Sequence, residues 1–100
     1  MRWLGSLGGP GKLMREGEPI ATVECSVDVF LEEDRKTQVA KGGIKGSHTT
    51  LDDVLIDGGA DLKLQSGETL SIVILSLGEP DLLGNACAEV MISGDVPGFE

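Results

Sequence analysis

The clearest pattern in the chain is an alternation of apolar and polar residues in the segment VECSVDVFL, residues 23–31. Successive side chains of a β-strand point to opposite faces of a sheet, so this period of two predicts a strand with one buried face. The apolar positions are the odd-numbered ones, Val23, Cys25, Val27, Val29 and Leu31. Phe30 lies on the other, polar face and breaks the alternation. We therefore predict a long strand over 20–32 whose odd positions build the core.

Further apolar runs, separated by turn sequences, predict five more strands. They are expected at residues 12–15, 37–44, 61–65, 68–77 and 86–93. The run at 68–77 is apolar on both faces, which predicts a central strand or one covered on both sides. In the run at 37–44, Val39 and Ile44 differ by an odd number, so a regular strand cannot bury both. A bulge at Gly42-Gly43 would add one residue and reconcile them.

The segment SHTTLDDVLIDGG has a helical period instead. Its apolar residues at i, i+3 and i+4 are Leu51, Val54 and Leu55. This spacing predicts one short helix near 51–57. Thr50 and Asp53 fit a loose capping box at its start, and Gly58 is placed to end it. A strand over 53–57 is the alternative.

Together these elements predict a mainly β fold with about six strands. An antiparallel meander of this kind buries its apolar face as a small barrel or a sandwich, and the expected bulge favours the barrel. One hundred residues correspond to one domain. We expect residues 1–10 to be an irregular, Gly-rich lead-in and residues 11–100 to form the single β domain.

Charge and composition narrow the classes of partner. The chain has 17 acidic and 8 basic residues, a net charge of −9. This charge repels nucleic acid and anionic membranes, so neither is an expected partner. The simplest explanation of this charge is that it keeps the protein soluble. The functional alternative is that it attracts a basic partner. The sequence shows neither a signal peptide nor an apolar stretch of membrane-spanning length, which predicts a cytoplasmic protein with Cys25 and Cys87 reduced.

The residues offer one candidate catalytic site and one candidate metal site, and each has a structural alternative. Cys25 and His48 are the parts of a Cys–His nucleophile, with Asp52 or Asp53 to orient the base. Cys25, however, lies on the predicted buried face, where a thiol behaves as a small apolar group and its pKa rises. The acidic cluster consists of Asp52, Asp53, Asp57 and Asp61. It lacks the remaining oxygen ligands and the terminal Glu of a calcium loop, so helix and turn positions explain it.

The glycine-rich segment GSLGGPGK ends in Lys12 but lacks the preceding strand and the Ser or Thr of a phosphate-binding P-loop. The sequence therefore predicts no metal site, no cofactor and no catalytic residues.

The function expected from these residues is a non-enzymatic binding or accessory module that acts through protein–protein contacts, with a partner protein or as a homo-oligomer. Phe30 is the predicted partner-binding residue, because aromatic side chains are enriched in interface cores. The alternative for Phe30 is burial under the lead-in or under the C-terminal tail, held by Phe99. Alternative functions are a small-ligand pocket in the mouth of the barrel and, less favoured, a Cys- or carboxylate-dependent enzyme.

Overall fold

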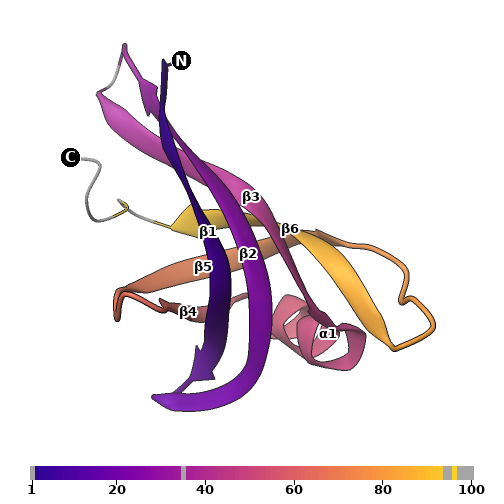
Figure 1. The fold of residues 1–100 in the computed structure, drawn as a ribbon. Coiled ribbons are helices and arrows are strands. Elements are labelled where there is room, and N and C mark those ends of the chain that lie inside the picture. Colours follow the sequence, from indigo (N-terminus) through magenta and orange to yellow (C-terminus); the bar gives the residue numbers. More distant parts are fainter. Residues whose placement is uncertain (1, 35, 94–95, 97–100) are drawn as a thin grey trace.

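The computed structural model describes residues 2–34, 36–93 and 96, and its strands form one closed antiparallel barrel (Figure 1). The strands are β1 (Arg2–Arg15), β2 (Glu18–Glu32), β3 (Thr37–Ser47), β4 (Ala60–Leu64), β5 (Thr69–Leu77) and β6 (Asn85–Ser93). The helix α1 (His48–Asp57) connects β3 to β4. Neighbours in the ring follow the order β1-β2-β3-β6-β5-β4, and β4 pairs back onto β1. The predicted mainly β fold, a six-stranded barrel with one short helix, is confirmed.

The barrel core is aliphatic, and β2 contributes the face that its alternation predicted. Val23, Cys25, Val27 and Val29 are all buried. Leu31 is only half-buried, because this end of β2 extends past the last residue of β3 that pairs with β6. The described residues include no buried polar or charged side chain.

The expected irregular lead-in is wrong, because Arg2–Pro10 are part of β1. This strand pairs with β2 from Arg2 opposite Leu31 to Arg15 opposite Glu18. Glycine lacks a side chain but keeps the backbone N–H and C=O groups that form a ladder, and β2 supplies their partners. The barrel therefore begins well before residue 11.

The expected bulge at Gly42-Gly43 is also wrong. The β2–β3 and β3–β6 pairings run through both glycines without a register shift. Ile44 is buried, whereas Val39 lies on the outer face beside Phe30. Gly42 is instead a point of close approach, since a Cβ there would overlap the Ser26 carbonyl oxygen. The register shifts occur elsewhere, in the β1–β2 and β5–β6 pairings.

The helix starts three residues earlier than predicted. Its N-cap is Ser47, which makes no side-chain capping bond, so Thr50 is inside the helix and the capping box is wrong. The first turn contains no acidic residue. The early start follows from the strand pairing, because the His48 N–H donates to the Gly84 carbonyl oxygen as soon as β3 ends.

The end of the helix agrees with the prediction. Gly58 has a φ of 90°, and its N–H donates to the carbonyl oxygens of Val54 and Leu55. Leu51 and Val54 are fully buried and join the barrel core, whereas Leu55 is 37% exposed. Figure 1 shows α1 at the end of the barrel where β3 finishes.

β5 is a central strand, paired with β4 and β6, and it is covered on one face only. Leu70, Ile72 and Ile74 are buried, but Leu75 is 53% exposed. The wall of an antiparallel barrel has the core on one side and solvent on the other, so the outer apolar residues of this strand remain accessible.

One part of the sheet projects from the barrel. The first residues of β1 and the hairpin between β2 and β3 extend beyond the end of β6 (Figure 1), and the molecule measures 42 Å along its longest axis. We call residues 2–4, 30–32 and 37–39 the hairpin arm. Phe99, expected to hold the tail, lies outside the described residues.

Candidate functional site

The Cys25 thiol is a core group and not an activated nucleophile. It is 6% exposed, and its Sγ donates to the Gly9 carbonyl oxygen at 3.2 Å. Burial raises the pKa of Cys25, and the nearby Glu24 carboxylate raises it further. His48 lies at the start of α1 and makes no hydrogen bond to this thiol within the described residues. The predicted packing of Cys25 in the core is confirmed.

The four aspartates have separate surroundings. Asp57 forms an ion pair with Arg15, with 2.6 Å between Oδ2 and Nη2, and Asp61 accepts a hydrogen bond from the Ser71 hydroxyl. Asp52 and Asp53 lie on α1. Within the described ranges, no three His, Cys, Asp or Glu side chains gather in a way that could hold a metal ion.

Phe30 lies on the outer face of the hairpin arm. Its Cα partners are Trp3 on β1 and Val39 on β3, so three apolar side chains form a row across neighbouring strands. The Lys41 Nζ is 5.9 Å from the centroid of the Phe30 ring. Phe30 is half-buried, whereas Trp3 is 59% exposed and its Nε1 donates to Asp28 at 3.4 Å. The segment expected to be a lead-in thus covers part of Phe30 and exposes a larger aromatic beside it.

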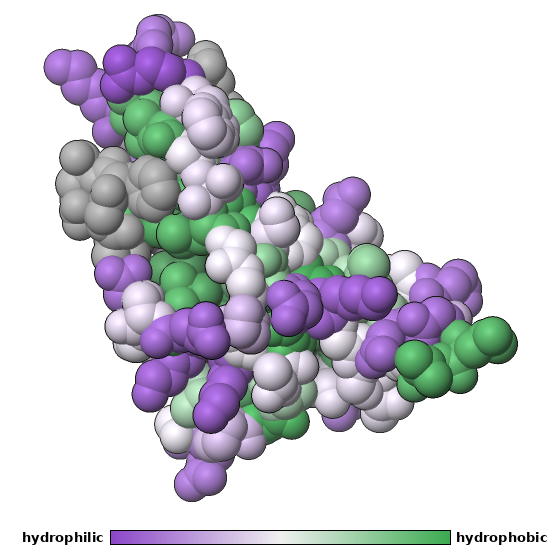
Figure 2. Space-filling view, viewed as in Figure 1, coloured by the Kyte–Doolittle hydropathy of each residue, from purple (hydrophilic) through white to green (hydrophobic). Residues whose placement is uncertain are grey.

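A second apolar surface lies on the loop between β5 and β6. Leu82 and Leu83 are almost fully exposed, and Figure 2 shows hydrophobic atoms at the tip of this loop. We call residues 78–84 the dileucine loop. From the sequence, this segment is expected only to be a loop between two strands. The available signal was the pair of leucines inside the turn sequence EPDLLG.

The side chain of Asp81 forms hydrogen bonds with the backbone on the C-terminal side of the dileucine loop. Its Oδ1 accepts hydrogen bonds from the Leu83 N–H at 2.9 Å and the Asn85 N–H at 3.0 Å. The backbone adds a bond of 2.7 Å from the Asp81 N–H to the Asn85 oxygen. The hydrogen bond from Asn85, followed by that from Leu83 and the charge of Lys45, lowers the pKa of Asp81. The carboxylate is therefore ionised at neutral pH and keeps the two leucines in place.

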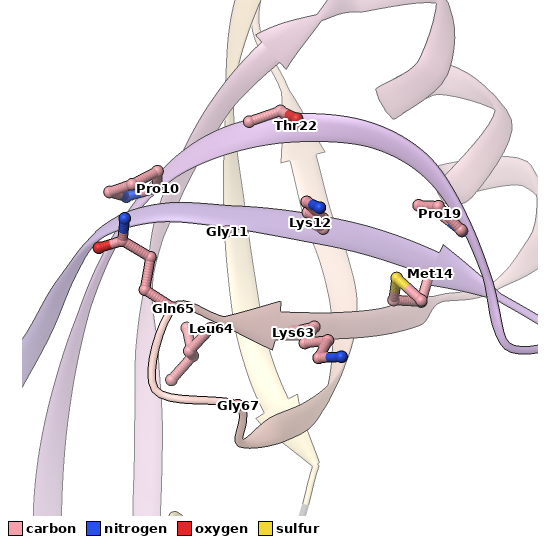
Figure 3. A pocket seen from close by; sticks show the side chains of 10 residues that line it. All are labelled: Pro10, Gly11, Lys12, Met14, Pro19, Thr22, Lys63, Leu64, Gln65 and Gly67. Carbon is pink, nitrogen blue, oxygen red and sulfur yellow. The ribbon is translucent and has the colours of Figure 1, made fainter.

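The described part of the chain contains an open groove of about 550 Å³. It lies against β1, β2, β4 and the turn after β4, and Figure 3 shows its lining side chains. These include Pro10, Lys12, Met14, Thr22, Lys63 and Leu64. Its exposed side chains belong to the outer face of the barrel, whereas a ligand pocket was expected in the barrel mouth. Aliphatic side chains fill the interior instead.

Comparison with known proteins assigns no relative. No family model matches the chain, and neither the curated proteins nor the solved structures include a match. The helix in the described residues is too short and too polar to span a membrane. Functional inference therefore depends on the geometry of these surfaces.

Proposed function

We propose that this chain is a small non-enzymatic binding module that recognises a protein partner through the dileucine loop. The observation that carries the proposal is the exposure of two adjacent leucines on a loop that Asp81 holds in place. Adjacent apolar side chains that are almost fully exposed are a feature of many interaction sites. A loop already held in its binding conformation also loses less conformational entropy on association.

The charges around the loop indicate which kind of partner it would bind. Glu79 and Asp81 flank the leucines, and the whole chain carries a net charge of −9. We infer a partner with an apolar pocket rimmed by Lys and Arg, because opposite potentials favour encounter and specificity. A second copy of this chain carries the same acidic charge, which disfavours a homo-oligomer at this surface. The same net charge disfavours nucleic acid and anionic membranes.

Phe30 is proposed as a second contact with the partner. Trp3 lies beside it on the hairpin arm and is the more exposed of the two. Aromatic anchors of this kind dominate many interfaces, so the arm and the loop would supply two separate contacts. A cytoplasmic location, in keeping with two free cysteines, belongs to the same proposal.

The experiment starts from the purified full chain, used to capture a partner that is then identified, purified and measured by calorimetry. Replacing Leu82 and Leu83 by Ser should raise Kd by about tenfold or more, which is about 1.4 kcal/mol. The matched control is Ile56→Ser, which removes an exposed apolar residue of α1 and should leave Kd unchanged. An unchanged Kd for the double variant contradicts the proposal. Self-association that the double variant abolishes would identify a second copy as the occupant instead.

Asp81 provides an independent prediction about the loop. Asp81→Ala removes the acceptor of two amides, so hydrogen exchange at Leu83 and Asn85 should accelerate while amides in the barrel core keep their protection. Asp81→Asn is the control, since it retains an acceptor oxygen without the charge. Because the native pKa of Asp81 is lowered, its contribution is present above the ordinary value of 3.8 and is lost as the pH falls through the native pKa. Exchange rates that do not change in Asp81→Ala would show that the carboxylate does not hold the loop.

A further inference from the structure

The groove on the outer face of the barrel contains two lysines at directly opposed positions. Lys12 on β1 and Lys63 on β4 are Cα partners, and both side chains are exposed. Their neighbours Leu13 and Leu62 are fully buried, so the two lysines share the outer face. Directly opposed residues of an antiparallel pair have Cβ atoms about 4.5–5.5 Å apart, and like charges at this position destabilise the sheet. The closure of the barrel thus places two lysines directly opposite each other on its outer face.

Among the described residues, no acidic side chain forms an ion pair with Lys12 or Lys63. The ion pair within the described residues joins Arg15 to Asp57, and neither Lys12 nor Lys63 takes part in one. The chain has more than twice as many acidic as basic residues, so partners for two surface lysines are abundant. Two opposed and unpaired lysines in such a chain form a local positive site.

The nearest acidic residues along the strands lie at the edges of this site. Asp61 is two residues before Lys63 on the outer face of β4, and its Oδ1 accepts from the Ser71 hydroxyl at 3.2 Å. Glu24 lies on β2 between its Cα partners Pro10 and Lys45. Among the described residues, neither carboxylate forms an ion pair with Lys12 or Lys63.

Two hydroxyl groups extend the lysine pair into a row across four strands. Thr22 on β2 is the Cα partner of Lys12, and Thr69 on β5 is the Cα partner of Lys63. Both threonines are exposed on the outer face. The row Thr22–Lys12–Lys63–Thr69 therefore presents two cationic donors with a hydroxyl group beside each, and ammonium groups are suitable donors for an oxyanion.

The groove also has apolar walls. Pro10 and Met14 lie on either side of Lys12 along β1, and Leu64 follows Lys63 (Figure 3). Its volume of about 550 Å³ is within the usual range for small-molecule sites. We propose that this groove binds a small phosphate monoester, with the phosphate between Lys12 and Lys63 and an apolar body against Pro10 and Met14. The two lysine charges match a phosphate monoester, which carries about −1.5 to −2 at pH 7, better than a single carboxylate.

The experiment titrates the full chain, labelled with ¹⁵N, with phenyl phosphate at low salt. Saturable shifts are expected at the amides of Lys12, Thr22 and Lys63, and calorimetry then gives Kd. Inorganic phosphate, which lacks an apolar body, and benzoate, which carries one charge, should each bind about threefold more weakly or worse. Affinity for phenyl phosphate should fall below about pH 6, where the ligand loses its second charge.

The variants Lys12→Gln and Lys63→Gln should each raise Kd by about threefold or more, and the double variant by about tenfold. Lys45→Gln is the matched control, because it removes the same charge from the outer face of β3 and should leave Kd unchanged. Without ligand, Lys63→Gln should melt no earlier than the native chain, since it relieves a repulsion. The absence of saturable shifts, or equal loss in the Lys45→Gln control, would overturn the site. Benzoate or inorganic phosphate binding as tightly as phenyl phosphate would overturn its assignment to a phosphate monoester.

Discussion

The strand β2 fills the barrel interior with larger side chains, whereas its two neighbours, β1 and β3, often place glycines opposite them. β2 points a row of valines and Cys25 into the barrel, whereas the inward positions beside them are often glycines. Gly11 is the Cα partner of Val23, Gly9 of Cys25, and Gly42 of Val27. A six-stranded barrel has a narrow interior, so large side chains on one strand require small residues on the next.

Three of the glycines in β1 and β3, Gly11, Gly42 and Gly46, lie where a larger residue would collide with a neighbouring strand. A Cβ at Gly46 would lie 2.7 Å from the Val23 Cγ1, and one at Gly11 would lie 3.0 Å from the Leu62 Cδ1. Both distances are shorter than ordinary carbon contacts. In this part of the barrel, small residues on one strand leave room for the large side chains of the neighbouring strand.

The largest expected effect is on the valine side of this comparison. Val27→Asp should unfold the domain, because an unpaired buried charge costs about 5 kcal/mol, similar to the lower end of typical domain stability. Ser26→Asp is the control on the outer face of the same strand and should change stability by about 0.5 kcal/mol or less. Urea denaturation followed by circular dichroism measures both. A folded Val27→Asp variant would mean that β2 does not bury its odd face.

The next effect is on the glycine side. Gly42→Ala should destabilise the barrel by about 3 kcal/mol, because its Cβ would overlap the Ser26 carbonyl oxygen and lie 2.7 Å from the Val27 Cα. Gly43→Ala is the adjacent control, since its Cβ would lie 3.4 Å from the Ala88 oxygen, an ordinary contact. Its stability should be unchanged or slightly raised. Equal denaturation midpoints for the two variants would show that β2 and β3 do not approach so closely.

The same contrast explains what the sequence could and could not predict. The alternation in β2 predicted its buried face because each inward residue is itself apolar. In β1 the inward residues Gly9 and Gly11 carry no such signal, and only pairing with β2 and β4 identifies the strand. The prediction of a bulge at Gly42-Gly43 was wrong because the sequence does not show where the backbones of two strands approach each other.

The candidate sites also differ in whether a local sequence pattern reveals them or only the pairing of distant strands does. Phe30 was found from its position in a local pattern. The pairing of Lys12 with Lys63 could not be found, because it requires the register by which β4 closes the ring onto β1. The exposure of Leu82 and Leu83 depends on hydrogen bonds to Asp81, which only a structure shows.

A smaller effect is expected where β2 leaves the barrel. Phe30→Ala should lower stability by about 1–2 kcal/mol, less than the 3–5 kcal/mol of a fully buried Phe, because the ring is half-buried beside Trp3. Trp3→Ala, which removes a more exposed ring, should cost less than this. If Phe30 also contacts the partner, Phe30→Ala should weaken binding by more than its effect on folding explains. A loss of 3 kcal/mol or more with unchanged binding would assign Phe30 to the fold alone.

The mildest test uses the unaltered chain. It measures the rate at which a thiol reagent labels each of the two cysteines. Cys25 points from β2 towards the carbonyl oxygen of Gly9, and the fit of the two strands keeps it buried with a raised pKa. Cys87 on β6 is exposed. Because the thiolate is the reactive form, Cys87 should react at the rate of a solvent thiol and Cys25 only through opening of the barrel. Cys87→Ser isolates Cys25, which should then react slowly under native conditions and rapidly in denaturant. Rapid native labelling of that variant would show that β1 does not seal the core beside Gly9.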